Sequence, residues 1–334
     1  MQTSTAQKTD LAELARRVAH RTIEIGYPDW DWGEGVAWHG VAEAGVRLHD
    51  GGLLEAASGW LHRHRDVQPN ELRRVMPGLV ATTVYRANHD EIALELAHRV
   101  AALLEHNPRN VHGVYAESVD IPVWVDYWYE ITPFLTDLAR VTGDERYREW
   151  AGEQSFAFVH SSWDARASLF HHAYYDLNRQ TSQWFWARAN GWAALAAVEM
   201  ITDLSDQRAL RATLLNILRR HVDRIQQLQD GSGLWHTVMD IPSTYLEVSA
   251  SVMFALAIKR GVRRGYLEPD LEKVADRAFY ACLEHVDAAG NVNEVSAETV
   301  PGDIAHYRSI PLGVYPWGQG FTVLAILEWM GENL

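Results

Sequence analysis

The sequence predicts an all-α protein, an (α/α)6 barrel in which six helical hairpins close into a ring. Apolar residues recur at spacings of three and four through most of the 334 residues, as they do on one face of a helix. Segments with a wide polar face alternate with segments that are apolar or small nearly all round, in a diverged repeat of about 40 to 70 residues. Strand signals are few, and only "LWHTVMDI" (234–241) suggests a short hairpin arm.

The segments without a wide polar face are expected on the inside of the ring, because such helices are buried on both sides. An open superhelix would leave these inner faces exposed along a concave surface, so a closed toroid is predicted. The six inner helices are expected to begin near residues 33, 77, 125, 188, 247 and 318.

The amphipathic segments are expected on the outside, where a polar face meets water. Four of them show clear periodicity: 11–25, 91–106, 209–225 and 270–286. Nothing between the helical segments resembles a linker. The sequence therefore predicts one catalytic domain over residues 1–334.

Composition narrows the class of protein. The single cysteine, Cys282, excludes an internal disulfide, and the N-terminus has no apolar stretch for a signal peptidase or a membrane, so a soluble cytoplasmic protein is expected. A formal charge of −14 with scattered Lys and Arg argues against nucleic acid as a partner. The oligomeric state is left open.

The chain has 14 tryptophans, and many of them lie in the loops that precede the expected inner helices. Alternate helices run in opposite directions, so all six inner N-termini should open on one end of the toroid and form one cleft. Helix N-termini suit anionic or hydroxyl-rich ligands, and aromatic faces suit the C–H surfaces of a sugar. Any one tryptophan, such as Trp30, Trp60, Trp128 or Trp329, is more often a packing residue, but six such loops together favour binding.

Asp126 is the candidate general acid. It lies at the first turn of an inner helix, where Trp124, Tyr127 and Trp128 should desolvate its carboxyl and raise its pKa. Glu130, four residues on, faces the same side and should raise that pKa further. The competing interpretation is a helix N-terminal acid that stabilises the dipole.

Two other carboxylates, Asp176 and Glu247, could complete a glycosidase pair with Asp126, and the sequence gives no separation between them. The histidines lack metal-ligand spacing, so no metal is expected, and no cofactor motif is present. Cys282 lies on an outer helix, where inert burial is its expected role.

These motifs give the chain a resemblance to the unsaturated glucuronyl and galacturonyl hydrolases of glycoside hydrolase families 88 and 105. It covers most of the sequence, from "WDWGEGVAWHGV" through "WVDYWYEITPFL", "ASLFHHAYYD" and "WARANGWAALAAVEM" to "SGLWHTVMDIPSTYLEVSAS". The resemblance implies an (α/α)6 barrel without a metal, Asp126 as the acid and base, and a sugar site lined by His172, Trp186 and Arg188. The expected substrate-binding set is completed by the other aromatic and charged residues of the loops: Trp32, Arg73, Trp124, Glu130, Trp235, His236 and Trp317.

Enzymes of this kind remove a 4,5-unsaturated uronic acid from the oligosaccharides that a polysaccharide lyase produces, by protonation and hydration of a vinyl ether. The expected partner is thus a small, anionic oligosaccharide. Two other functions stay open: an (α/α)6 glycosidase or lyase for a saturated uronic or neutral sugar, and a non-catalytic sugar-binding protein.

Three positions depart from the pattern of the resembled families. Arg73 stands where an Asp is usual in an N-x-D context, Ala116 where a Lys is usual, and Glu130 where a Met is common. We expect Arg73 and Glu130 to form a compensating pair across two inner helices. The departures leave open whether the substrate or the chemistry differs.

Overall fold

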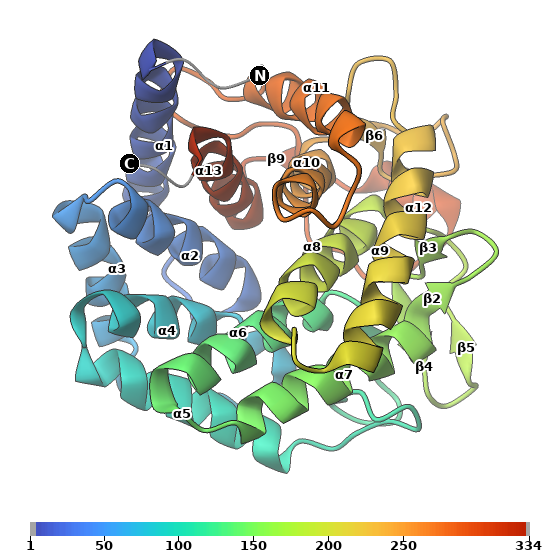
Figure 1. The fold of residues 1–334 in the computed structure, drawn as a ribbon, viewed down its shortest axis with the longest axis horizontal. Coiled ribbons are helices and arrows are strands. Elements are labelled where there is room, and N and C mark those ends of the chain that lie inside the picture. Colours follow the sequence, from blue (N-terminus) through green and yellow to red (C-terminus); the bar gives the residue numbers. More distant parts are fainter. Residues whose placement is uncertain (1–4, 332–334) are drawn as a thin grey trace.

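The structure, a computed structural model, describes residues 5–331, and it is a closed ring of helical hairpins (Figure 1). Each inner helix packs against the next, and the last packs against the first, so the predicted (α/α)6 barrel is confirmed. The inner helices begin within a few residues of the expected starts: α2 (Trp32–Arg47), α4 (Pro77–Asn88), α6 (Tyr127–Thr142), α8 (Ala187–Asp203), α10 (Val248–Arg263) and α13 (Pro316–Met330).

The outer helices cover this ring: α1 (Thr5–Ile25), α3 (Gly51–Arg63), α5 (Glu91–His106), α7 (Arg146–Ser162), α9 (Arg208–Gln227) and α11 (Glu272–Leu283). Two of them, α3 and α7, lie outside the four ranges expected from periodicity. In α7 the buried face includes Gln154 and Ser155, which are polar, so its apolar period is interrupted.

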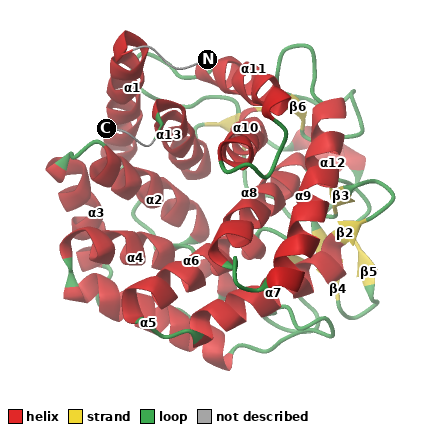
Figure 2. Ribbon diagram, in the orientation of Figure 1, coloured by secondary structure: helices red, strands yellow, loops and turns green. Residues whose placement is uncertain are grey.

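Short antiparallel strands lie in the loops between the helices (Figure 2). They are β1 (Val123–Trp124), β2 (Trp163–Asp164), β3 (Leu169–Phe170), β4 (Ala173–Tyr175), β5 (Gln180–Thr181), β6 (Trp235–His236), β7 (Leu246–Glu247), β8 (Val295–Ser296) and β9 (Leu312–Gly313). They pair as β1-β4-β5, β2-β3, β6-β7 and β8-β9. The expected hairpin arm is thus present as β6. The remaining elements are η1 (Leu72–Arg74), η2 (Pro269–Leu271) and α12 (Ile304–Ser309).

The ring closes where α13 meets α2, through two facing glycines. A Cβ on Gly320 would lie 2.2 Å from the Val36 carbonyl oxygen, and one on Gly40 would lie 2.9 Å from the Gly320 Cα. Both distances are far inside van der Waals contact, so the two backbones approach as closely as they do only because neither residue carries a side chain.

Two carboxylates fix the starts of inner helices. Asp31 caps α2 by accepting from the Trp32 N–H at 2.7 Å, and Glu247 caps α10 by accepting from the Ser249 and Ala250 N–H groups. Both caps hold loops at the end of the ring where the inner helices begin. Of the helices in residues 5–331, none is long and apolar enough to cross a membrane.

Candidate active site

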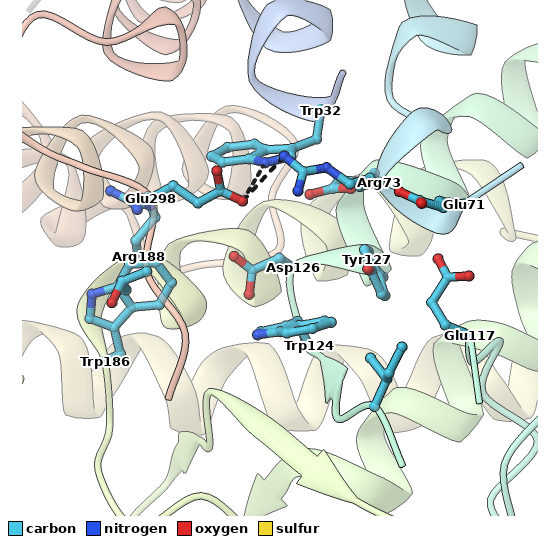
Figure 3. A pocket seen from close by; sticks show the side chains of 13 residues that line it. Trp32, Glu71, Arg73, Glu117, Trp124, Asp126, Tyr127, Trp186, Arg188 and Glu298 are labelled. Carbon is cyan, nitrogen blue, oxygen red and sulfur yellow. Dashed lines mark hydrogen bonds and ion pairs between the residues drawn. The ribbon is translucent and has the colours of Figure 1, made fainter. Parts of the chain in front are cut away.

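A pocket of about 460 Å³ opens at the end of the ring where the inner helices begin (Figure 3). Its wall comes from loops that are far apart in the sequence, as the convergence of the helix N-termini predicts. The lining residues are Trp32, Glu71, Arg73, Glu117, Ile121, Trp124, Asp126, Tyr127, Glu130, Trp186, Arg188, Glu298 and Thr299.

Asp126 lies in the middle of this pocket, immediately before α6, between Trp124 and Glu298 (Figure 3). Its side chain makes no capping hydrogen bond to the helix, and its buried Oδ2 has no hydrogen-bond partner among the described residues. Burial raises the pKa of the Asp126 carboxyl to about 7, although the positive charge of Arg188 opposes the rise. A carboxyl group with this pKa is suited to donate a proton near neutrality.

Glu130 lies one turn further along α6 and is 2% exposed. Burial, and then the charge of Asp126, raise the pKa of Glu130 well above its usual range. The charge of Asp126 thus adds to the raised pKa of Glu130, whereas the carboxylate that adds to the raised pKa of Asp126 is Glu298.

Arg188 projects from the first turn of α8 and is 1% exposed. Its Nη1 donates to the Ser296 carbonyl at 2.8 Å and to the Ser296 hydroxyl at 2.7 Å, and its Nη2 donates to the Ala297 carbonyl at 2.8 Å. The guanidinium lies 4.3 Å from the centre of the Trp186 ring. Arg188 thus lines the pocket and also supports the loop that follows β8.

Arg73 does not form the expected pair with Glu130, so that prediction is wrong. Its Nε donates to Asp31 at 2.8 Å, and its Nη2 lies 3.4 Å from Glu298. Although burial opposes its charge, the hydrogen bond to Asp31 raises the pKa of Arg73. The physical reason is proximity: η1 places Arg73 beside Asp31, the cap of α2, and both ion pairs of Arg73 are made there and with Glu298, not with Glu130.

Aromatic rings form most of the apolar wall. Trp124 lies beside Asp126, and Trp186 lies beside Arg188 (Figure 3). Trp32 stacks on Trp317 with ring centres 4.4 Å apart, and Trp317 stacks in turn on Tyr315. Trp317 therefore supports the wall from behind and does not line the pocket itself.

Three further residues of the expected set lie away from the pocket wall. His172 is fully buried behind Trp186, with its Nδ1 2.8 Å from the Tyr307 hydroxyl, and burial lowers its pKa well below the usual range. Trp235 packs in the core and donates to the Ile225 carbonyl. His236 lies in β6 with its Nδ1 2.6 Å from the Thr244 carbonyl oxygen. From their position before an inner helix, the sequence places these three residues at this end of the ring. That position alone does not show whether a side chain contacts the pocket.

The two alternative carboxylates are also outside the pocket lining. Asp176 accepts from the Val111 N–H at 3.4 Å, and Glu247 is the buried cap of α10. Ala116 is buried in the preceding loop, where it accepts from the Asn107 side chain, and the neighbouring Glu117 reaches the pocket instead.

Sequence reasoning missed several lining residues, above all Glu298. This residue lies in an irregular loop between β8 and α12, without helical or strand periodicity. Glu117, Ile121 and Thr299 share that lack of local pattern. Glu117, Glu298 and Thr299 offer only an acidic or polar residue in a loop, which is typical of any surface, and Ile121 offers only a single apolar residue.

The barrel places one carboxyl group with a pKa of about 7 among aromatic and arginine side chains, an arrangement suited to an enzyme that performs acid–base chemistry on a sugar. The chain belongs to the family described as glycosyl hydrolase family 88, whose sequence model matches residues 8–331. It is therefore a glycoside hydrolase.

Relatives and solved structures agree with this assignment. The chain is 29% identical over 325 residues to the unsaturated rhamnogalacturonyl hydrolase YesR of Bacillus subtilis (strain 168), across 93% of this chain and 92% of that protein. A possible member of the GH105 family from Salmonella enterica has the same fold, with a TM-score of 0.90, 24% identity and coverage of 97% and 94% of the two chains. An unsaturated glucuronyl hydrolase from Bacillus sp. GL1 aligns with a TM-score of 0.75 and 16% identity over 96% of each chain.

Proposed function

We propose that the protein removes a 4,5-unsaturated uronic acid from the non-reducing end of a short oligosaccharide, with Asp126 as the general acid and then the base. The observation that carries the proposal is a single carboxyl group of pKa about 7 inside a pocket lined by aromatic rings and Arg188. The unsaturated rhamnogalacturonyl hydrolase of Bacillus subtilis, which is similar over nearly its whole length, supports the same reaction.

The reaction begins at the vinyl ether of the unsaturated sugar. Protonated Asp126 transfers its proton to C4, and the positive charge that develops at C5 is shared with the ring oxygen. Water adds to C5 and gives a proton to the Asp126 carboxylate, which restores the acid. The hemiketal so formed opens, and the bond to the neighbouring sugar breaks. One carboxyl group serves both steps, so Asp176 and Glu247 are not needed in the pocket.

The substrate in this proposal is anionic. Nη2 of Arg188 carries two N–H groups and makes one hydrogen bond among the described residues, to Ala297. The second N–H can bind a uronate oxygen, because a charge-assisted hydrogen bond to guanidinium is strong in a buried pocket. Trp124 and Trp186 offer ring faces for the sugar's C–H surfaces.

The proposal is tested with Asp126→Asn, because the amide fills the same space but cannot donate this proton. Loss of turnover should be about 10² to 10⁴-fold, the usual contribution of a general acid, with the melting temperature nearly unchanged. Turnover is followed as loss of the ultraviolet absorbance of an unsaturated disaccharide. A disaccharide with the same linkage and neighbouring sugar but a saturated uronic acid is the matched control; its cleavage, measured as release of the neighbouring sugar, should not occur. More than half of the wild-type rate in the variant would contradict the role of Asp126.

A further inference from the structure

The short segment after β8 is held by an unusual number of buried polar groups. The Ser296 carbonyl accepts from Arg188 and from Trp317 Nε1, and the Ser296 N–H donates to Glu247 at 2.9 Å. Arg188 and Glu247 are each 1% exposed. Burying an arginine and a glutamate is costly unless their hydrogen bonds are satisfied. Arg188 at the start of α8 and Glu247 at the start of α10 both make hydrogen bonds with Ser296, so together they fix the position of this loop.

Glu298 is the residue that this support brings to the pocket. Its Oε1 lies 3.3 Å from Trp32 Nε1 and 3.4 Å from Arg73 Nη2, and Arg73 is itself held by Asp31. Glu298 projects over Asp126 from the side opposite Trp124 (Figure 3). Its side chain is 54% exposed, and Oε2 makes no hydrogen bond or ion pair within residues 5–331.

We propose that Glu298 is a second substrate-contacting carboxylate, whose free Oε2 accepts a hydrogen bond from a ring hydroxyl of the terminal sugar beside Asp126. This inference rests on the proposed function. A carboxylate accepts hydrogen bonds and cannot donate them, so the sugar group that it recognises is a hydroxyl. Because both groups are negative, the uronate carboxylate of the substrate is disfavoured on this side of the pocket. Arg73 and Trp32 fix the direction of the free oxygen by holding the other one.

The same geometry has an electrostatic consequence for the acid. After burial, and against the opposing charge of Arg188, the negative charge of Glu298 adds to the raised pKa of Asp126. Removing that charge should lower the pKa of Asp126, so its protonated form should be lost at a lower pH. Glu298 therefore affects both substrate affinity and the pH range of activity.

The experiment compares Glu298→Gln with Glu284→Gln, which removes an exposed carboxylate at the C-terminal end of α11, outside the pocket lining. With the unsaturated disaccharide, Glu298→Gln should raise KM roughly tenfold or more, as expected for a hydrogen bond to a charged group, and should move the alkaline limb of the pH–rate profile to lower pH. Glu298→Asp, which keeps the charge, should restore the position of the limb. Glu284→Gln should behave like the wild type.

The outcomes separate this inference from the proposed function. If the wild type and Glu284→Gln both fail to consume the unsaturated disaccharide, the proposed function is wrong. If they are active and Glu298→Gln has the same KM and the same alkaline limb, the assignment of Glu298 is wrong. A lowered melting temperature in Glu298→Gln with an unchanged limb would also overturn it, because a structural role would then explain the loss.

Discussion

Asp126 and Glu130 are two carboxyl groups at the start of α6 whose pKa values are both raised by burial. Asp126 borders the open pocket and has a pKa of about 7, whereas Glu130 is almost completely buried and its pKa is raised well above the usual range. Burial disfavours the ionised form of both groups, and the charge of Asp126 adds to this effect at Glu130. Activity that depends on protonated Asp126 should therefore fall as the pH rises through about 7.

These raised pKa values predict the effect of Glu130→Gln. The amide has the same size and lacks charge, and the raised pKa of Glu130 favours its neutral form, so the alkaline limb should stay within about half a pH unit of the wild type. The limb is measured from the pH dependence of kcat/KM with an unsaturated disaccharide. Asp126→Asn, which removes the titrating group itself, is the matched contrast. A clear shift of the limb to lower pH would show that Glu130 is ionised and repels Asp126, as sequence reasoning first suggested.

At the scale of elements, the sequence predicts helices better than loops. The six inner helices could be placed because an apolar surface on all sides has a single physical explanation, burial within the ring. Asp126 could be identified for a related reason, since aromatic neighbours along the same helix start imply desolvation. The loop that carries Glu298 offered no such pattern, and its position depends on contacts with Arg188 and Glu247, which are distant in sequence.

The seam between α2 and α13 gives a prediction about packing. Gly320→Ala should destabilise the protein by about 1–3 kcal/mol or more, because the added methyl group meets the Val36 backbone, which cannot move without shifting α2. The matched control is Gly59→Ala in α3, where a Cβ has no heavy atom closer than 3.9 Å. That change should stabilise by roughly 0.5–1 kcal/mol, through helix propensity alone.

Thermal and urea unfolding of both variants test this difference in sign. Equal and small effects of the two alanines would mean that α2 and α13 can separate without cost, and the ring would then not depend on close contact at its seam.

At the scale of the whole molecule, ion pairs connect the inner helices at the end opposite the pocket, near their C-termini. Each inner helix contributes a charged residue to this group, which we call the charge ring. The pairs are Glu43–Arg86, Arg86–Asp137, Arg140–Asp137, Arg140–Asp203, Arg264–Glu199, Arg260–Glu199 and Arg260–Glu328. These pairs link α2 to α4, α4 to α6, α6 to α8, α8 to α10 and α10 to α13 by charge as well as by apolar packing.

The pairs of the charge ring differ in burial, and this sets their contribution to stability. Arg260 is 14% exposed and connects α10 to both α8 and α13, whereas Arg140 is 53% exposed. Although burial opposes its charge, Glu199 and Glu328 raise the pKa of Arg260. A partly buried charge that loses its partner costs far more than an exposed one, since water cannot replace the lost interaction.

Arg260→Met should therefore destabilise the protein by about 3 kcal/mol, because it leaves Glu199 and the almost fully buried Glu328 with one arginine less each. Arg140→Met, the matched control, should cost at most about 1 kcal/mol. Urea unfolding measures the free energy of unfolding of both variants. The loss caused by Arg260→Met should be smaller when Glu328 is also changed to Gln, because the two side chains interact directly. Kinetics on the unsaturated disaccharide should remain close to wild type in folded Arg260→Met, because the charge ring and the pocket occupy opposite ends of the inner helices. Equal and small losses of stability in the two variants would show that the helices are held together by apolar packing alone.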